Sequence, residues 1–303
     1  MNFGLIIIGD EILSGKRADK HLAKAIELLG ARGLQLAYAD YVGDDPQRIT
    51  ARLARAFTSG DIVFSCGGIG ATPDDHTRQC AARALGRELV LHPQAEALIR
   101  ERMQDVAREQ GIPYEPDRSD NLHRLNMGMF PAGADIIPNP FNKIPGFYCT
   151  LGERGGRQFS AGPPQEKLAP MVGSDPHAVG ERGGNIHGGV FFFPGFPVMA
   201  WPMMEWVLDT HCRHYFASDA WVEKSVIVFG AMESTLTPLM EDLERLYAVK
   251  VFSLPSVDHP EYGRHIELGV KGAPVAVERA YTVLFDELGK LQLKLGPELV
   301  RKL

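Results

Sequence analysis

Runs of apolar residues alternate with amphipathic stretches over the first half of the chain. Runs with the length of buried strands lie at residues 3–8, 34–42 and 61–66. Stretches with apolar residues at helical spacing lie at residues 19–29, 43–57 and 93–110. This order is typical of βαβ units, in which helices cover a mostly parallel sheet.

Local signals support several of these element boundaries. Asp45 is the expected N-cap of a helix whose first residue is Pro46, because a proline lacks the N–H that the first turn leaves unbonded. Gly30 suits the end of the preceding helix. A weak strand pattern at 134–138 and a further strand pattern at 190–194 extend the expected sheet.

The pattern changes after residue 220. Residues 222–291 read as strand, helix, strand, strand and helix, which predicts a small two-layer α+β domain. We therefore expect an α/β domain over residues 1–217 and a β-α-β-β-α domain over residues 221–303. Residues 151–187 are rich in glycine, proline and polar residues, which predicts a long surface insertion in the first domain.

Composition narrows the class of protein. A chain of 303 residues with 45% hydrophobic and 23% charged residues can bury a core without disulfides. The net charge of -6 argues against nucleic acid as the partner and favours a small molecule. The four cysteines form no CxxC pair, which favours a reducing, cytoplasmic compartment, and no apolar window is long enough to span a membrane.

The sequence CGGIGATPDD, which starts at Cys66, holds the main candidate site. Gly67, Gly68 and Gly70 let backbone N–H groups approach a ligand closely, as in phosphate-binding loops. One interpretation of the acids is structural: the spacing from Thr72 to Asp75 fits a capping box, with a helix starting at residue 73. The other is functional.

In the functional interpretation the glycine loop holds phosphate oxygens. Asp74 or Asp75 then binds a divalent metal such as Mg²⁺ that bridges to the phosphate, so the acids need not repel the anion. We expect a ligand at this loop under either interpretation of the acids.

Two further strand ends are candidates. GDEILSG, residues 9–15, follows the first strand and places Asp10 and Glu11 at the carboxyl edge of the sheet, beside the glycine loop. These acids could instead cap local amides. PGFP, residues 194–197, either closes over a ligand or only connects a strand to a helix, and spacing alone favours the connection.

GDEILSG, VGDD, CGGIGATPDD, NPFNKIPGF and PGFP, in this order, resemble the competence/damage-inducible protein A (CinA) family. The resemblance covers residues 1 to about 215, in the molybdopterin-binding domain that this family shares with proteins of molybdenum-cofactor biosynthesis. It implies a three-layer α/β/α fold followed here by the small α+β domain. The implied catalytic residues are Asp74, Asp75 and Asp10. The implied ligand-binding residues are Glu11, Ser14, Gly15, Asp44, Gly67, Gly68, Gly70, Thr72, Pro194 and Gly195.

The family resemblance implies two functions. The first is metal-dependent pyrophosphate cleavage of ADP-ribose or a similar nucleotide. The alternative is non-catalytic binding of molybdopterin, or a role in its biosynthesis. A third hypothesis is a protein-interaction or assembly factor with a vestigial cleft, and a homo-oligomer is compatible with this fold class.

Three departures from the family pattern matter. His21 stands where the family usually has asparagine after the GDE motif, the 151–187 segment is unusual, and the chain stops where longer members continue into a deamidase domain. We expect that second activity to be absent.

Overall fold

The computed structural model describes residues 1–150, 188–216 and 221–302. The expected insertion at 151–187 and the expected boundary near residues 217–220 lie outside the described residues. By its internal contacts the chain forms two compact units, Met1–Leu28 with Gln35–Tyr215, and Leu29–Leu34 with Phe216–Leu303. No helix in the described ranges is both long and apolar enough to cross a bilayer.

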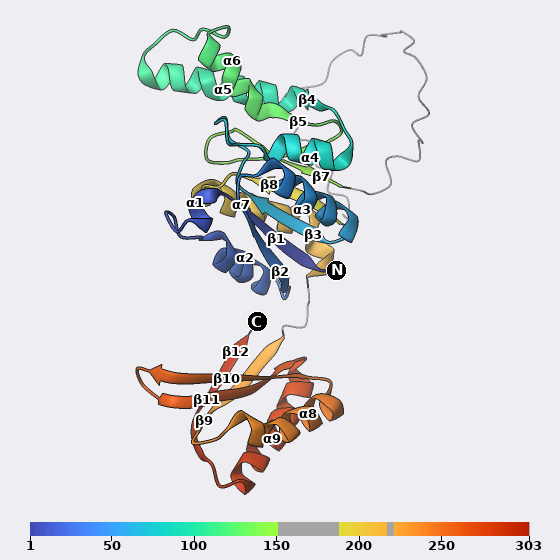
Figure 1. The fold of residues 1–303 in the computed structure, drawn as a ribbon, viewed down its shortest axis with the longest axis vertical. Coiled ribbons are helices and arrows are strands. Elements are labelled where there is room, and N and C mark those ends of the chain that lie inside the picture. Colours follow the sequence, from blue (N-terminus) through green and yellow to red (C-terminus); the bar gives the residue numbers. More distant parts are fainter. Residues whose placement is uncertain (151–187, 217–220, 303) are drawn as a thin grey trace, which may run out of the picture. The chain divides into compact units, whose positions relative to one another are not determined.

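A six-stranded sheet forms the centre of the first unit (Figure 1). Its strands, in spatial order, are β2 (Leu36–Val42), β1 (Phe3–Ile8), β3 (Ile62–Cys66), β8 (Gly189–Phe193), β7 (Gly146–Cys149) and β6 (Asp135–Ile137). The first four are parallel to one another, and the last two join antiparallel. The sheet is therefore mixed but mostly parallel, as the alternating pattern predicts.

Helices cover both faces of this sheet and make three layers. The remaining α-helices and strands of the unit are α1 (Asp10–Leu13), α2 (His21–Gly30), α3 (Pro46–Ser59), α4 (Thr77–Leu85), β4 (Leu89–Leu91), α5 (Pro93–Gln110), α6 (Ser119–Leu125), β5 (Met129–Pro131) and α7 (Pro197–His211). Strand β8 shows the layering: Phe192 contacts Phe57 of α3, whereas Phe191 points the other way and contacts His211 of α7. This confirms the α/β/α class.

The second unit is a two-layer α+β fold with its own core. Its elements are β9 (Val222–Phe229), α8 (Glu233–Tyr247), β10 (Lys250–His259), β11 (Gly263–Gly272), α9 (Pro274–Lys290) and β12 (Lys294–Lys302). The antiparallel sheet has the order β10-β11-β9-β12, which with two helices is the ferredoxin-like β-α-β-β-α-β arrangement. The final strand, β12, was not predicted.

Candidate functional site

Four parallel strands deliver their following loops to one edge of the main sheet. In register, Ile8 of β1 lies beside Val42 of β2, and Cys66 of β3 lies beside Phe193 of β8. The loops that follow these strands contain GDE, GDD, the glycine motif and PGFP. GDE and the glycine motif therefore lie at the same carboxyl edge of the sheet, as expected, and GDD and PGFP join them there. Ligands bind α/β sheets at this edge.

Close packing explains the first two glycines of the loop after β3. Gly67 has a φ of 105° and Gly68 a φ of 67°. A Cβ atom at Gly67 would collide with the carbonyl oxygen of Ile8, and one at Gly68 would collide with the Thr77 hydroxyl. Only glycine fits both positions without strain.

The loop uses some of its own N–H groups and leaves others available. The Gly67 N–H donates to the carbonyl of Phe193, 3.0 Å away, and the Gly70 N–H donates to Asp75. Within the described residues, no protein acceptor binds the N–H groups of Gly68, Ile69 and Ala71, and all three residues line the adjoining cleft. Successive free N–H groups of this kind form an anion-binding concavity.

Asp75 holds this loop together by three hydrogen bonds, ahead of helix α4. One carboxylate oxygen accepts the Gly70 N–H at 2.9 Å, and the other accepts the Thr72 N–H at 2.8 Å and the Thr72 hydroxyl at 2.6 Å. The expected helix start at residue 73 is wrong, because α4 starts at Thr77, but the capping-box bond from the Thr72 N–H to the Asp75 carboxylate does form. Asp75 therefore closes a turn ahead of the helix.

Asp74 and Arg78, which flank Asp75 in the sequence, differ in burial: Asp74 is exposed and Arg78 is buried. Asp74 is exposed and lines the cleft, and the nearby Thr72 hydroxyl, followed by backbone N–H donation, lowers its pKa. Arg78 is buried, and its guanidinium donates to the carbonyl of Ile69. Burial lowers the pKa of Arg78 to about 10, so it stays charged at neutral pH and puts a cation next to the glycine loop.

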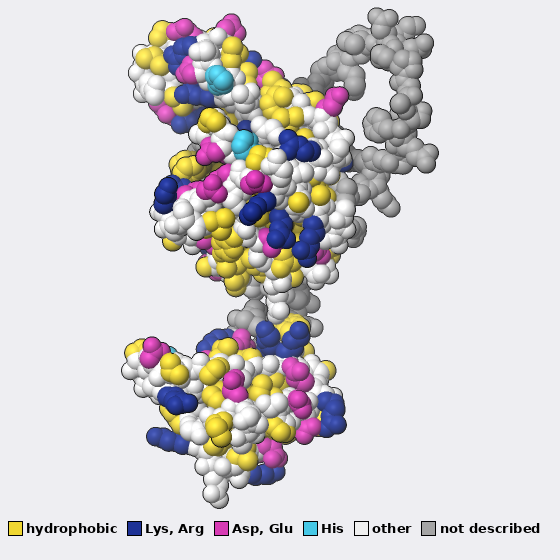
Figure 2. Space-filling view, viewed as in Figure 1, with side chains coloured by type: hydrophobic (Ala, Val, Ile, Leu, Met, Phe, Trp, Pro, Cys, Tyr) yellow, Lys and Arg dark blue, Asp and Glu magenta, His cyan; other side chains and the backbone are white. Residues whose placement is uncertain are grey.

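Asp10 and Asp44 join the loops after β1 and β2 by reciprocal hydrogen bonds. The Asp10 N–H donates to the Asp44 carboxylate at 2.8 Å, and the Asp44 N–H donates to the Asp10 carboxylate at 3.1 Å. Partial burial raises the pKa of Asp44, and the charges of Asp10, Glu11 and Asp74 add to this effect. Acidic side chains also gather in the space-filling view over the part of this unit where α1 lies (Figure 2).

A cleft of about 380 Å³ opens at this edge, within the usual size range for small-molecule sites. Ten of the predicted ligand or catalytic residues line it: Glu11, Asp44, Gly67, Gly68, Gly70, Thr72, Asp74, Asp75, Pro194 and Gly195. Three predicted residues do not, namely Asp10, Ser14 and Gly15. Ser14 and Gly15 close the end of α1 through hydrogen bonds from their N–H groups, and Asp10 supports Asp44.

Sequence reasoning did not single out one part of the lining. It consists of Arg17, Met127, Asn139, Asn142, Ile144, Pro145, Phe196 and Met199. Most of these residues are apolar, so the cleft has an acidic, amide-rich part and an apolar part. Four of these eight lining residues belong to the motif NPFNKIPGF, and Phe196 belongs to the PGFP motif. Both motifs were signals from which this part of the lining could have been predicted.

The rim of the cleft is held by His21 at the start of α2. Its Nε2 lies 3.1 Å from the carbonyl oxygen of Gly195, and because a carbonyl only accepts, this nitrogen carries the hydrogen. The other ring nitrogen is buried without a partner. Burial lowers the pKa of His21, so the ring is neutral near pH 7.

Asp44 and Asp74 are the acidic residues of the cleft that could hold a divalent cation together with a phosphate. Across the described ranges, no group of three or more His, Cys, Asp or Glu side chains is arranged to hold an ion by itself. Mg²⁺ usually binds through one or two carboxylates plus substrate phosphates, so such a group is not required. Asp74 and Asp44 provide carboxylates beside the free loop amides, whereas both oxygens of Asp75 are already engaged.

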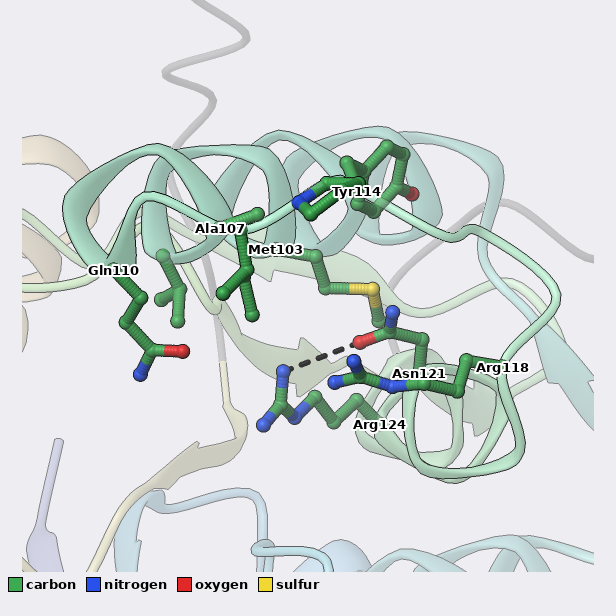
Figure 3. Close-up of a pocket in the computed structure, with 10 residues that line it drawn as sticks. Met103, Ala107, Gln110, Tyr114, Arg118, Asn121 and Arg124 are labelled. Atoms are coloured by element: carbon green, nitrogen blue, oxygen red, sulfur yellow. Dashed lines mark hydrogen bonds between the residues drawn. The ribbon is translucent and has the colours of Figure 1, made fainter.

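A second cavity lies between α5 and α6 (Figure 3). It has a volume of about 20 Å³, room for roughly one water molecule. On the α6 side, Arg124 donates to Asn121 of the same helix at 3.2 Å. This cavity is too small for a metabolite, so the cleft at the sheet edge is the stronger candidate.

Comparisons with known proteins identify the family of the first unit. Residues 4–214 match the family described as "Probable molybdopterin binding domain". A CinA-like protein of Geobacter metallireducens is 36% identical over 174 residues, which are 57% of this chain and 39% of that protein. The chain thus spans less than half the length of that relative.

A longer relative and a solved structure are also similar to this chain. A protein of Pyrococcus furiosus is 27% identical over 252 residues, 83% of this chain and 84% of that protein. The crystal structure of a protein CinA of unknown function from Thermoplasma acidophilum has a TM-score of 0.48 and 23% identity, covering 69% of this chain and 96% of the other. With the family match over more than half of its length, the chain belongs to the molybdopterin-binding-domain family and, within it, to the CinA-like proteins.

Proposed function

We propose that this CinA-like protein is a metal-dependent pyrophosphatase that acts on ADP-ribose or a similar nucleotide diphosphate. The observation that carries the proposal is the meeting of free loop amides and separate carboxylates in one cleft. A pyrophosphate needs both hydrogen-bond donors for its oxygens and carboxylates for a cation that neutralises its charge. We expect this small molecule to be the binding partner, rather than a nucleic acid or a membrane. A cytoplasmic location stays a prediction.

The N–H groups of Gly68, Ile69 and Ala71 would bind the phosphoryl oxygens. Donors held by a fixed backbone can stabilise charge that develops on these oxygens as the P–O–P bridge breaks. Arg78 adds positive charge from the buried side of the loop. Hydrolysis of ADP-ribose adds one water across the bridge and releases AMP and ribose 5-phosphate.

Asp74 and Asp44 suit different tasks because their pKa values move in opposite directions. Asp74, with a lowered pKa, stays ionised and would hold the cation, which supplies charge neutralisation when bound. Asp44, with a raised pKa, is the better group to accept a proton from the attacking water. Asp10 keeps Asp44 in place through the two reciprocal hydrogen bonds.

The test is release of AMP from ADP-ribose by the purified chain, scanned over divalent metals. Asp74→Asn should abolish the metal-dependent release, and Asp44→Asn should lower the rate on the order of 10²-fold or more. Asp75 is left intact because it supports the loop. Asp258→Asn, an exposed acid of β10, is the matched control and should keep full activity. Absence of release with every metal would rule out the enzyme.

The alternative function is binding of molybdopterin without turnover. It is favoured by the engagement of both Asp75 oxygens within the loop, which leaves fewer carboxylates for a metal. Equilibrium dialysis with molybdopterin in the presence of a chelator decides this case. Retention of molybdopterin without metal supports a binding module, and absence of retention rules this function out.

A further inference from the structure

Phe196 has an exposed side chain where its neighbours in the sequence are buried. Phe191, Phe192 and Phe193 are fully buried in β8, whereas 55% of the Phe196 surface is exposed. Phe196 lines the cleft just before α7. An exposed aromatic ring in the wall of a ligand cleft offers a flat surface for stacking.

Arg17 lies beside this ring and is the one Lys, Arg or His side chain among the described residues that line the cleft. The centre of its guanidinium is 5.8 Å from the centre of the Phe196 ring, and one of its nitrogens is 3.7 Å from the Glu11 carboxylate. A guanidinium is planar and stacks on aromatic faces and heterocycles. The Arg17 guanidinium therefore places a planar cation over an exposed aromatic ring in the wall of the cleft.

The backbone that carries Phe196 is held on both sides. His21 donates to the carbonyl of Gly195, and the carbonyl of Phe196 accepts the N–H groups of Met199 and Ala200 at 3.0 and 2.9 Å. The ring is therefore presented by a fixed turn, and a ligand that stacks on it need not order a loop first.

The remaining neighbours in the lining are apolar. Met199 lies one helical turn after Phe196, and Met127, Ile144 and Pro145 also line the cleft. A sugar or phosphate alone would leave this part of the cleft without a complementary group, because its polar atoms would be desolvated there. A planar heterocycle would cover it.

We infer that Phe196 and Arg17 form a stacking subsite for the planar nitrogen heterocycle of the phosphate-bearing ligand. This rests on the proposed function, in which the phosphate occupies the loop of Gly68, Ile69 and Ala71. The subsite recognises the ring as a flat π system, a chemistry that adenine and pterin share. Stacking on an aromatic side chain tolerates either ring, since every base has a π face.

Calorimetric titration with AMP, a pterin monophosphate and ribose 5-phosphate tests the subsite. Phe196→Leu should weaken binding of the preferred ring compound on the order of tenfold and leave ribose 5-phosphate unchanged. Phe196→Trp should preserve the ring preference, since it keeps a flat face. Phe141→Leu is the matched control, because Phe141 is 60% exposed but does not line the cleft.

The titrations with the three compounds distinguish a failure of the stacking subsite from a failure of the proposed function. Whichever of AMP and the pterin phosphate binds more tightly identifies the ring. Equal binding of all three phosphates, or equal weakening of all three in Phe196→Leu, overturns the subsite while phosphate binding stands. A ring preference that disappears in Phe196→Leu supports the subsite even if ADP-ribose is not hydrolysed. Absence of binding by all three compounds overturns both proposals.

Discussion

Asp74 and Asp75 are adjacent in the sequence but have different roles in the structure. Asp75 accepts three hydrogen bonds that close the loop, whereas Asp74 is exposed in the cleft. We predict that Asp75→Asn lowers the free energy of unfolding by about 1–3 kcal/mol, because its amide group cannot accept at both positions. Asp74→Asn should change this free energy little. Urea unfolding of both variants checks the prediction, and equal losses would contradict it.

His21 predicts a pH dependence of stability. Burial lowers its pKa in the folded protein below the ordinary value of 6.5, so the unfolded chain binds more protons just below that pH. Stability is therefore fully present above about pH 6.5 and falls as the pH drops, by at most about 1.4 kcal/mol per pH unit for one such group.

The measurement is the free energy of unfolding of the wild type and His21→Asn at several pH values from 5 to 8. The asparagine amide can still donate to Gly195 but does not titrate, so the variant should show a smaller slope. His92, whose pKa is also lowered by burial, leaves part of the slope in both proteins. An unchanged slope in His21→Asn would show that His21 titrates as it does in the unfolded chain.

Some site residues could be predicted from the sequence, and others could not. Gly68, Asp44 and Asp74 follow strands in recognisable motifs, so their meeting at one edge follows from sheet geometry. Arg17 was not predicted, because an isolated arginine has no spacing that distinguishes it. Phe196 was missed although it lies in the PGFP motif, because spacing alone favoured that motif as a connection. The bond from the Thr72 N–H to Asp75 was expected from their spacing, whereas the bond from the Gly70 N–H was not, because contacts within a turn leave no periodic pattern.

At the scale of elements, the glycine loop predicts a steric effect at Gly67. Gly67→Ala should destabilise the protein more than Gly15→Ala, because its Cβ would meet the carbonyl of Ile8, whereas nothing lies within 4 Å of a Cβ at Gly15. Both glycines have positive φ, 105° and 72°, so Gly67→Ala adds the collision and a less favourable φ to the backbone strain that both substitutions share. Gly15→Ala should cost about 1–2 kcal/mol from backbone conformation alone. Thermal unfolding measures both, and similar losses would contradict the packing argument.

Elements with strong periodicity were predicted well, and short or terminal ones were not. The helix expected at 93–110 is α5, and Asp45 and Pro46 begin α3 as expected. Strand β7 has only four residues and β12 is interrupted by a bulge between Leu295 and Glu298, so neither shows a clear alternation. The start of α4 was placed four residues early because the Thr72 to Asp75 spacing imitates a cap.

At the scale of the whole molecule, the second unit has an apolar core of its own. The core includes Val226, Val228, Leu268 and Leu284, and all of its residues lie between positions 222 and 295. We predict that residues 221–303 fold when expressed alone. Circular dichroism should show a single cooperative thermal transition, and removing residues 294–303 should abolish it because β9 would lose its neighbour β12. A fragment without cooperative unfolding would contradict the prediction.

The position of β8 also has a consequence for synthesis of the protein. This strand pairs with β3 and β7, yet it lies more than 120 residues after β3 in the chain, and the bond from His21 to Gly195 joins residues 174 positions apart. A nascent chain on the ribosome therefore exposes the open edge of β3 until residue 193 emerges, and exposed strand edges promote aggregation. Slow translation before that point should increase the dependence of this protein on chaperones, and the cleft can close only when the first unit is nearly complete.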